Sequence, residues 1–136
     1  MDTPMKDHAS KCIVIIPAYR EQGRIGKVVE EVRKMIPVVL VVDDGSDDNT
    51  AGEAEKAGAV VLRHPKNMGK GVALDDGIKY ALEKKFETLI TMDGDGQHDP
   101  QDIMDFLDAY AKGVAAVIIG NRMGNPGTMP FIRKIT

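Results

Sequence analysis

The chain has 136 residues, and its formal net charge is −3 because 21 Asp and Glu residues outnumber 18 Lys and Arg residues. This length suits a single domain, and a composition of 43% apolar and 29% charged residues excludes wholesale disorder. The acidic balance disfavours nucleic acid as a partner, the one cysteine excludes an internal disulfide, and no apolar run reaches the roughly 18 residues of a membrane span. We therefore expect a soluble domain of the cytoplasm.

Short apolar runs alternate with helical patterns along the chain, after a polar segment at 1–11 that we expect to be a flexible leader. The expected strands are rich in Val and Ile: Cys12–Ala18, Val38–Asp43, Ala59–Arg63, Thr88–Asp93 and Val114–Gly120. The expected helices lie between them: Arg24–Ile36, Thr50–Ala57, Lys70–Phe86 and Pro100–Lys112. Strict alternation of this kind predicts an α/β fold with a doubly wound, mostly parallel sheet.

Two of the expected helix boundaries carry local signals. Thr50 followed by Glu53 fits a capping box at the start of the second helix, and Gly58 follows the end of that helix. Asp99 before Pro100 places a cap residue in front of a proline at the first helical position.

Polar residues follow each expected strand, at the edge where parallel α/β sheets bind ligands. The segments concerned are 17–21, 43–48, 64–71, 93–98 and 120–122. Four carboxylates and several basic side chains are therefore expected to converge on one edge of the sheet, and we interpret this convergence as a binding site.

Asp93 and Asp95 lie two residues apart at a strand end, so that their side chains tend to share a face. Together with the amide oxygen of Gln97, these carboxylates suit a hard divalent cation such as Mg²⁺. The alternative is a turn in which the aspartates only cap backbone amides. The residues by themselves leave both interpretations open.

Asp43 and Asp44 end an apolar strand, where an unpaired carboxylate is costly to bury. One of them is expected to accept hydrogen bonds from a base or a ribose, although a simple turn is the alternative. Lys70 stands at the start of the third helix and can hold phosphate together with the first amides of that helix. A plain glycine turn explains this segment equally well, because the sequence around Lys70 is not a P-loop.

Other polar side chains also have two interpretations each. Tyr19 can stack on a base or simply cover the sheet end, and Glu21 can bond a nucleotide or cap a helix. Arg122 can neutralise a diphosphate or form a surface ion pair. His8 and His64 show no partner pattern in the sequence.

Taken together and in order, these segments resemble the family-2 inverting glycosyltransferases with the nucleotide-sugar-binding GT-A fold. The resemblance covers about residues 11–122. The segment DGDGQHDP at 93–100 is most similar to the branch that makes polyprenyl- or dolichyl-phosphate sugars.

The resemblance implies a set of site residues. Asp93 and Asp95 would be the catalytic carboxylates of a DXD motif, which meet the nucleotide sugar and its Mg²⁺ or Mn²⁺ ion, and Gln97 would be a further metal ligand. The implied nucleotide-binding residues are Pro17, Tyr19, Glu21, Asp43 or Asp44, Lys70 and Asp93. Arg122 and Arg133 would face phosphate on the acceptor side.

The resemblance also implies an activity and a domain organisation. The enzyme would transfer a sugar, with inversion, from a UDP- or GDP-sugar to a polyprenyl or dolichyl phosphate or to a glycan acceptor, in cell-envelope biosynthesis. Residues 12–122 would form the nucleotide-sugar-binding domain, and residues 123–136 would begin an acceptor-binding part that is truncated here. The full-length protein would act at the inner face of the membrane, and the truncated surface would favour a homo-oligomer.

Two alternatives accompany this interpretation. The chain would be a donor-binding fragment without turnover, or a Mg²⁺-dependent phosphatase of the haloacid dehalogenase type that uses Asp93 as nucleophile with Asp95 two residues on. Against the phosphatase, the pair follows the fourth expected strand and not the first.

Overall fold

Apolar runs form a five-stranded sheet at the centre of the computed structural model, which describes residues 11–95, 103–105, 107–108 and 131–134. The strands are β1 (Cys12–Ala18), β2 (Val38–Asp43), β3 (Val60–Arg63), β4 (Thr88–Thr91) and β5 (Phe131–Lys134). Their order in the sheet is β3-β2-β1-β4-β5. Strands β1 to β4 run parallel, and β5 runs antiparallel to β4 at the edge.

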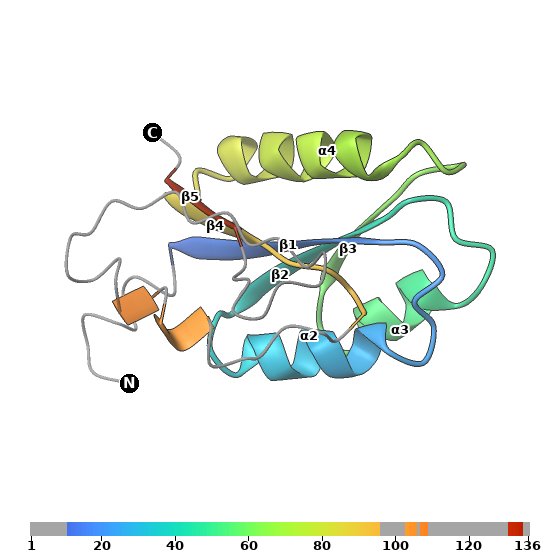
Figure 1. Ribbon diagram of the computed structural model, residues 1–136, viewed down its shortest axis with the longest axis horizontal. Coiled ribbons are helices and arrows are strands. Elements are labelled where there is room, and N and C mark those ends of the chain that lie inside the picture. The colour runs from blue at the N-terminus through green and yellow to red at the C-terminus, as the bar shows by residue number, and fades with distance from the viewer. Residues whose placement is uncertain (1–10, 96–102, 106, 109–130, 135–136) are drawn as a thin grey trace, which may run out of the picture.

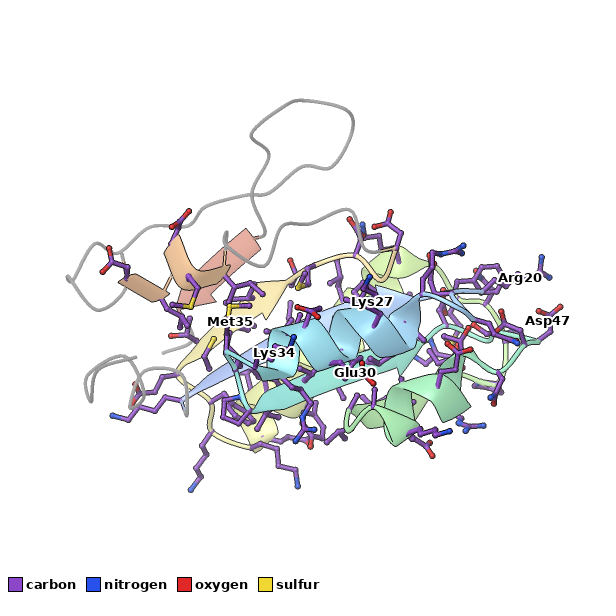
Figure 2. The ribbon with its side chains drawn as sticks, turned by 90° about the horizontal axis from the view of Figure 1, so that it is seen from below. Arg20, Lys27, Glu30, Lys34, Met35 and Asp47 are labelled. Carbon is purple, nitrogen blue, oxygen red and sulfur yellow. The ribbon has the colours of Figure 1, made fainter. Side chains whose placement is uncertain are left out.

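Helices cover both faces of the sheet (Figure 1). Helix α4 (Lys70–Glu83) lies on one face, and α2 (Ile25–Arg33) and α3 (Thr50–Lys56) lie on the other. Seen from below, α2 lies over the sheet and carries Lys27 and Glu30 on its outer side, with Lys34 just past its end (Figure 2).

The central strand is buried on both faces because each face has its own helical layer. Val14 and Ile16 of β1 belong to the core cluster that contains α2, whereas Ile13 and Ile15 belong to the cluster beneath α4. Successive side chains of a strand point to opposite faces, so a strand buried on both faces is apolar throughout. This packing explains the lack of polar alternation in the sequence of β1.

The first four expected strands and the first three expected helices are confirmed, with ends that differ by up to three residues. Helix α4 ends at Glu83, three residues before the expected end at Phe86. Lys85 has a positive φ of 62°, which ends the helical path, while Phe86 packs against the core beneath α4 and extends the apolar pattern past the helix. The apolar pattern of the sequence therefore continues past the end of the helix, because Phe86 packs against the core.

The capping box expected at the start of α3 is wrong. Asn49 is the N-cap residue and makes no side-chain cap hydrogen bond. The carboxylate of Glu53 instead accepts hydrogen bonds from the Gly23 amide, at 2.8 and 3.0 Å, and the Thr50 hydroxyl accepts one from the Glu21 amide, at 2.9 Å. Both side chains join α3 to the loop after β1.

The last strand and the last helix expected from the sequence fall largely on residues that the structure does not describe. The expected strand Val114–Gly120 lies outside the described residues, and of the expected helix Pro100–Lys112 the structure describes helical residues at 103–105 and 107–108. Ile103 and Leu107 are buried in the core cluster beside α2. Strand β5 was not expected from the sequence.

The described helices are short. The longest, α4, has 14 residues, and no helix in the described part of the chain has both the length and the apolar character that crossing a bilayer requires.

Gly77 is a point of close approach between α4 and β1. A Cβ atom at this position would lie 2.5 Å from Cγ2 of Ile15, a fully buried side chain. Alanine adds about 0.5–1 kcal/mol of helix propensity, but overpacking of a core typically costs about 1–3 kcal/mol. We expect Gly77→Ala to lower the free energy of unfolding by about 1–2 kcal/mol in urea denaturation.

The matched control is Gly71→Ala, also in α4, where an added Cβ atom meets nothing within 4 Å. This variant should be at least as stable as the parent chain. Equal effects of the two substitutions would contradict close packing at Gly77.

Candidate functional site

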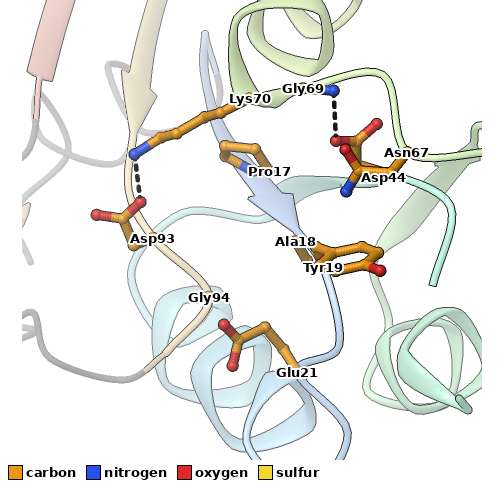
Figure 3. A pocket seen from close by; sticks show the side chains of 10 residues that line it. All are labelled: Pro17, Ala18, Tyr19, Glu21, Asp44, Asn67, Gly69, Lys70, Asp93 and Gly94. Carbon is orange, nitrogen blue, oxygen red and sulfur yellow. Dashed lines mark hydrogen bonds and ion pairs between the residues drawn. The ribbon is translucent and has the colours of Figure 1, made fainter.

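The candidate site lies at the point where the order of the strands in the sheet reverses, beside β1. The chain leaves β1 toward β2 and β3 on one side, while β4 pairs with β1 on the other. Loops that leave neighbouring strands in opposite directions open a crevice at the carboxyl ends of those strands. A pocket of about 260 Å³ occupies this place, and residues from the ends of β1, β2 and β4 and from the start of α4 line it: Pro17, Ala18, Tyr19, Glu21, Asp44, Asn67, Gly69, Lys70, Asp93 and Gly94 (Figure 3).

The loops after β1 and β2 are bonded to each other along their length. Four amides of these loops donate to side chains of the opposite loop or of α3: Arg20 to Ser46 Oγ at 2.9 Å, Glu21 to Thr50 Oγ1 at 2.9 Å, Gly23 to the Glu53 carboxylate and Asn49 to Gln22 Oε1 at 2.8 Å. We call these two loops the paired loops. Their mutual bonds fix one wall of the pocket.

An ion pair extends this connection at the surface. The guanidinium of Arg20 donates to both oxygens of Asp47, each at 3.1 Å, and the two side chains lie together at the end of the molecule (Figure 2). The same guanidinium lies 4.9 Å from the centre of the Tyr19 ring. Tyr19 lines the pocket, and 38% of the residue is exposed.

Asp44 is a buried carboxylate whose oxygens accept several hydrogen bonds. Only 4% of the residue is exposed, and its oxygens accept the Met68 amide at 2.8 Å and the Gly69 amide at 2.9 Å. His64 Nδ1 lies 2.9 Å from Asp44 Oδ1. Burial alone would raise the pKa of Asp44, but the hydrogen bonds from His64 and the two amides outweigh it and hold the pKa below its usual value. Asp44 is therefore an ionised anchor for the turn that leads into α4.

Lys70 and Asp93 meet across the pocket. Lys70 is the first residue of α4, and its Nζ lies 2.7 Å from Asp93 Oδ1 (Figure 3). The Asp93 side chain is 17% exposed, whereas that of Lys70 is 58% exposed. A part-buried carboxylate and an ammonium group thus form an ion pair at the pocket.

Glu21 lines the pocket on the side of α2. Its carboxylate accepts a hydrogen bond from Arg24 Nε at 2.7 Å. Glu21 therefore both lines the pocket and bonds the side chain of Arg24, the N-cap residue of α2.

The structure brings six of the sequence-predicted residues into this one pocket: Pro17, Tyr19, Glu21, Asp44, Lys70 and Asp93. Of the two candidate aspartates after β2, Asp44 lines the pocket and Asp43 does not. Asp43 Oδ1 instead accepts the Ser46 amide at 3.1 Å, as the turn alternative predicts.

The remaining candidates are placed less fully. Asp95 is described but does not line the pocket, and Gln97 and Arg122 lie outside the described residues. Arg133 lies in β5, opposite Leu89 of β4 in the backbone register. Among the described residues, no group of three His, Cys, Asp or Glu side chains gathers as a metal site. A cation at Asp93 would therefore need further ligands from elsewhere.

The pocket also includes residues of the expected loop segments beyond the candidates above. Ala18, Asn67, Gly69 and Gly94 line it and belong to the segments 17–21, 64–71 and 93–98 at the ends of expected strands. His64 was missed, because its two carboxylate partners are 20 and 12 residues away in the sequence.

Several curated relatives are named as sugar transferases or synthases of lipid phosphates. The UDP-N-acetylglucosamine–dolichyl-phosphate N-acetylglucosaminyltransferase of Methanococcus voltae is 31% identical over 90% of this chain and 57% of its own length. The polyprenol monophosphomannose synthase of Mycolicibacterium smegmatis is 34% identical over 88% of this chain and 48% of its own length. The chain thus spans about half the length of the curated relatives it matches first.

Solved structures share the fold. The glucosyl-3-phosphoglycerate synthase of Mycobacterium tuberculosis, in a complex with Mn²⁺, UDP-glucose and phosphoglyceric acid, superposes with a TM-score of 0.66 at 22% identity. The match covers 80% of this chain and 43% of that one. At this identity the likeness concerns the fold, which is that of a GT-A glycosyltransferase.

The sequence model of one family, described as glycosyl transferase family 2, matches residues 13–136, which is nearly the whole chain and includes every residue that lines the pocket. With the fold and these relatives, this match places the protein: the chain belongs to glycosyl transferase family 2.

Proposed function

We propose that the pocket binds the nucleoside diphosphate part of a nucleotide-sugar donor, UDP- or GDP-linked, and that the whole protein transfers the sugar with inversion to a polyprenyl or dolichyl phosphate. The observation that carries this proposal is the pocket at the switch point, in which Lys70 and Asp93 meet 2.7 Å apart next to the exposed Tyr19 ring. The cationic group would match the diphosphate, the anionic group the bound cation, and the aromatic ring the base.

Each part of the donor has a chemical counterpart in the pocket. Tyr19 offers a flat face to a base, and Asp44 lies at the same end of the pocket, where its carboxylate suits a donor group on a base or ribose. Lys70 begins α4, so its ammonium group adds to the partial positive charge of a helix start and suits a diphosphate. The donor would therefore lie from Tyr19 toward Asp93.

The residues fit a divalent cation, which we propose as the cofactor, Mg²⁺ or Mn²⁺. Asp93 holds the ammonium of Lys70, and a hard cation of this kind takes one or two protein carboxylates and completes its shell with water and phosphate oxygens. Asp93 and Asp95, with Gln97, would hold it. When bound, the cation stabilises the negative charge that grows on the leaving diphosphate.

The acceptor follows from the same chemistry. The acceptor oxygen would attack the anomeric carbon from the face opposite the diphosphate, and this attack inverts the configuration. A lipid phosphate is already ionised at neutral pH and needs no general base, which makes it our preferred acceptor over a glycan hydroxyl. Lys70 would stay on the leaving diphosphate, and Arg122 and Arg133 would face the acceptor phosphate.

The test is calorimetric titration of the chain with UDP and with GDP, each in Mn²⁺ and in EDTA. We expect one nucleotide to bind in Mn²⁺ and to bind at least about tenfold more weakly in EDTA. Asp93→Asn and Asp95→Asn should remove the Mn²⁺ dependence, and Lys70→Met should weaken binding in both conditions. Asp75→Asn is the matched control, because Asp75 is exposed on α4 and pairs only with Lys79 among the contacts described for it, at 3.1 Å.

Absence of binding of both nucleotides to the folded chain would contradict the proposal. Binding in Mn²⁺ without transfer of labelled sugar to polyprenyl phosphate would identify a donor-binding unit without turnover. Transfer to a glycan but not to the lipid phosphate would overturn the acceptor assignment alone.

A further inference from the structure

His64 sits between two carboxylates. It follows β3, its side chain is 9% exposed, Nδ1 lies 2.9 Å from Asp44 Oδ1, and Nε2 lies 2.7 Å from Asp76 Oδ2 of α4. An ionised carboxylate accepts hydrogen bonds and has no proton to donate. With both carboxylates ionised, both ring nitrogens donate, and this geometry favours the imidazolium form.

The charges around the ring agree with this protonation state. Hydrogen bonding to Asp44 raises the pKa of His64 most, burial lowers it, and hydrogen bonding to Asp76 raises it again, so that the pKa lies above its usual value. Asp44 faces the ring from the end of β2, and Asp76 faces it from α4. His64 thus lies between two structural elements that both favour its protonated form.

Asp44 links His64 to the wall of the pocket by hydrogen bonds. The oxygen that faces His64 also accepts the Met68 amide, and its second oxygen accepts the Gly69 amide. Gly69 and its neighbour Lys70 line the pocket, whereas His64 and Asp76 do not (Figure 3). An unbroken series of hydrogen bonds therefore runs from Asp76 on α4 through His64 and Asp44 to the pocket wall.

We propose that His64 is a positioning residue of the donor site: by donating to Asp44 and Asp76 at once, its imidazolium holds Asp44 against the Met68 and Gly69 amides and sets the wall from which Lys70 projects. This inference rests on the proposed function. Loss of a proton from either ring nitrogen would place a lone pair against a carboxylate and break one link of the series. Donor affinity should then fall as pH rises through the pKa of His64.

The pH dependence of nucleotide affinity should have the sign expected for a group whose pKa is raised in the folded chain. The positioning effect is complete below the ordinary histidine pKa of about 6.5 and is lost as pH rises through the higher pKa of the folded chain. We expect a roughly three- to tenfold loss of nucleotide affinity across that titration, since one charge-assisted hydrogen bond is removed at a distance from the ligand.

The first experiment needs no nucleotide. In the ¹⁵N-labelled chain, the ring signals of His64 and the amide signals of Met68 and Gly69 are followed by NMR as pH is raised from about 5.5 to 9.5, a range that brackets the ordinary histidine value. We expect the two amides to titrate with the midpoint of His64, above 6.5. Amides that stay fixed while His64 titrates, or a His64 midpoint at or below 6.5, would overturn the inference.

The second experiment measures affinity for UDP and GDP with Mg²⁺ against pH in the parent chain, His64→Gln and Asp76→Asn. Glutamine keeps a hydrogen-bond donor but does not titrate. The pH dependence that remains in His64→Gln therefore comes from groups other than His64, such as the phosphates of the nucleotide. The ratio of parent to His64→Gln affinity should decline toward one as pH rises. Asp76→Asn removes one source of the raised pKa without touching the pocket, and should move the decline to lower pH.

These outcomes separate a positioning role from a merely structural one, in which both variants would lose affinity equally at every pH. That equal loss would overturn the inference while leaving the proposed function intact. If neither nucleotide binds but the Met68 and Gly69 amides follow His64, the proposed function fails and the link from His64 to the pocket wall stands. Should His64→Gln not fold, Asp76→Asn and the amide titration decide alone.

Discussion

Asp44→Ala is expected to lower the free energy of unfolding by about 3–5 kcal/mol, the usual cost of removing one partner of a buried ion pair. The substitution leaves His64 as a buried cation with one partner fewer, and leaves the Met68 and Gly69 amides without their acceptor. Chemical denaturation at neutral pH measures this loss. Nucleotide binding should be lost with it, because the wall beside Lys70 is no longer anchored.

Asp47→Ala is the control, because Asp47 lies in the same loop but forms an exposed ion pair with Arg20. Its loss should cost about 0.2–1 kcal/mol. A second check uses Asp44→Asn against pH. Since the pKa of Asp44 is lowered by folding, its contribution is complete above about 3.9 and is lost as pH falls through the lower folded pKa. The stability difference between parent and Asp44→Asn should therefore shrink in acid, and a constant difference would contradict the anchoring role.

Gly45→Ala should lower the free energy of unfolding by about 2–5 kcal/mol. Gly45 has a φ of +79°, and an added Cβ atom would lie 2.2 Å from the backbone carbon of Lys66 and 2.3 Å from the Asn67 nitrogen. The strain of the left-handed conformation costs about 1–2 kcal/mol, and the clash with main chain, which has no rotamer to change, adds about 1–3 kcal/mol. Thermal unfolding followed by circular dichroism would show a lower midpoint.

Gly23→Ala separates the two causes. Gly23 also has a positive φ, +88°, but an added Cβ atom meets nothing within 4 Å. It should lose only the strain, about 1–2 kcal/mol. Because Asn67 lines the pocket, Gly45→Ala should also weaken nucleotide binding in the fraction that remains folded, whereas Gly23→Ala should not. Similar losses in the two variants would mean that the loop yields at Lys66.

The sequence predicted the first four strands and the first three helices because these depend on local patterns. The Val- and Ile-rich runs of β1 and β2 have the predicted bounds, since a strand buried on both faces carries an unbroken apolar signal. Strand β5 carries no such signal. It forms by antiparallel pairing with β4, a tertiary contact that the local sequence of 131–134 does not predict.

The candidate site was predictable to the extent that it follows strand ends. Tyr19, Asp44 and Asp93 stand just after strands, so the rule that ligands bind at carboxyl ends of parallel strands found them. The role of His64 was not predictable, because only the fold brings it between Asp44 and Asp76. Membership of glycosyl transferase family 2 decides, at the level of the family, for sugar transfer over the phosphatase interpretation of Asp93 and Asp95.

The paired loops have a thermodynamic consequence. Their amides are bonded when the chain folds, so the conformational entropy of this wall is lost once and is not lost again when a ligand arrives. A donor bound as we propose would meet Lys70 on the opposite wall, an exposed lysine whose ordering costs at most about 2 kcal/mol. In the proposed binding mode the paired loops lose no further conformational entropy, and affinity would gain from this preorganisation without any additional contact.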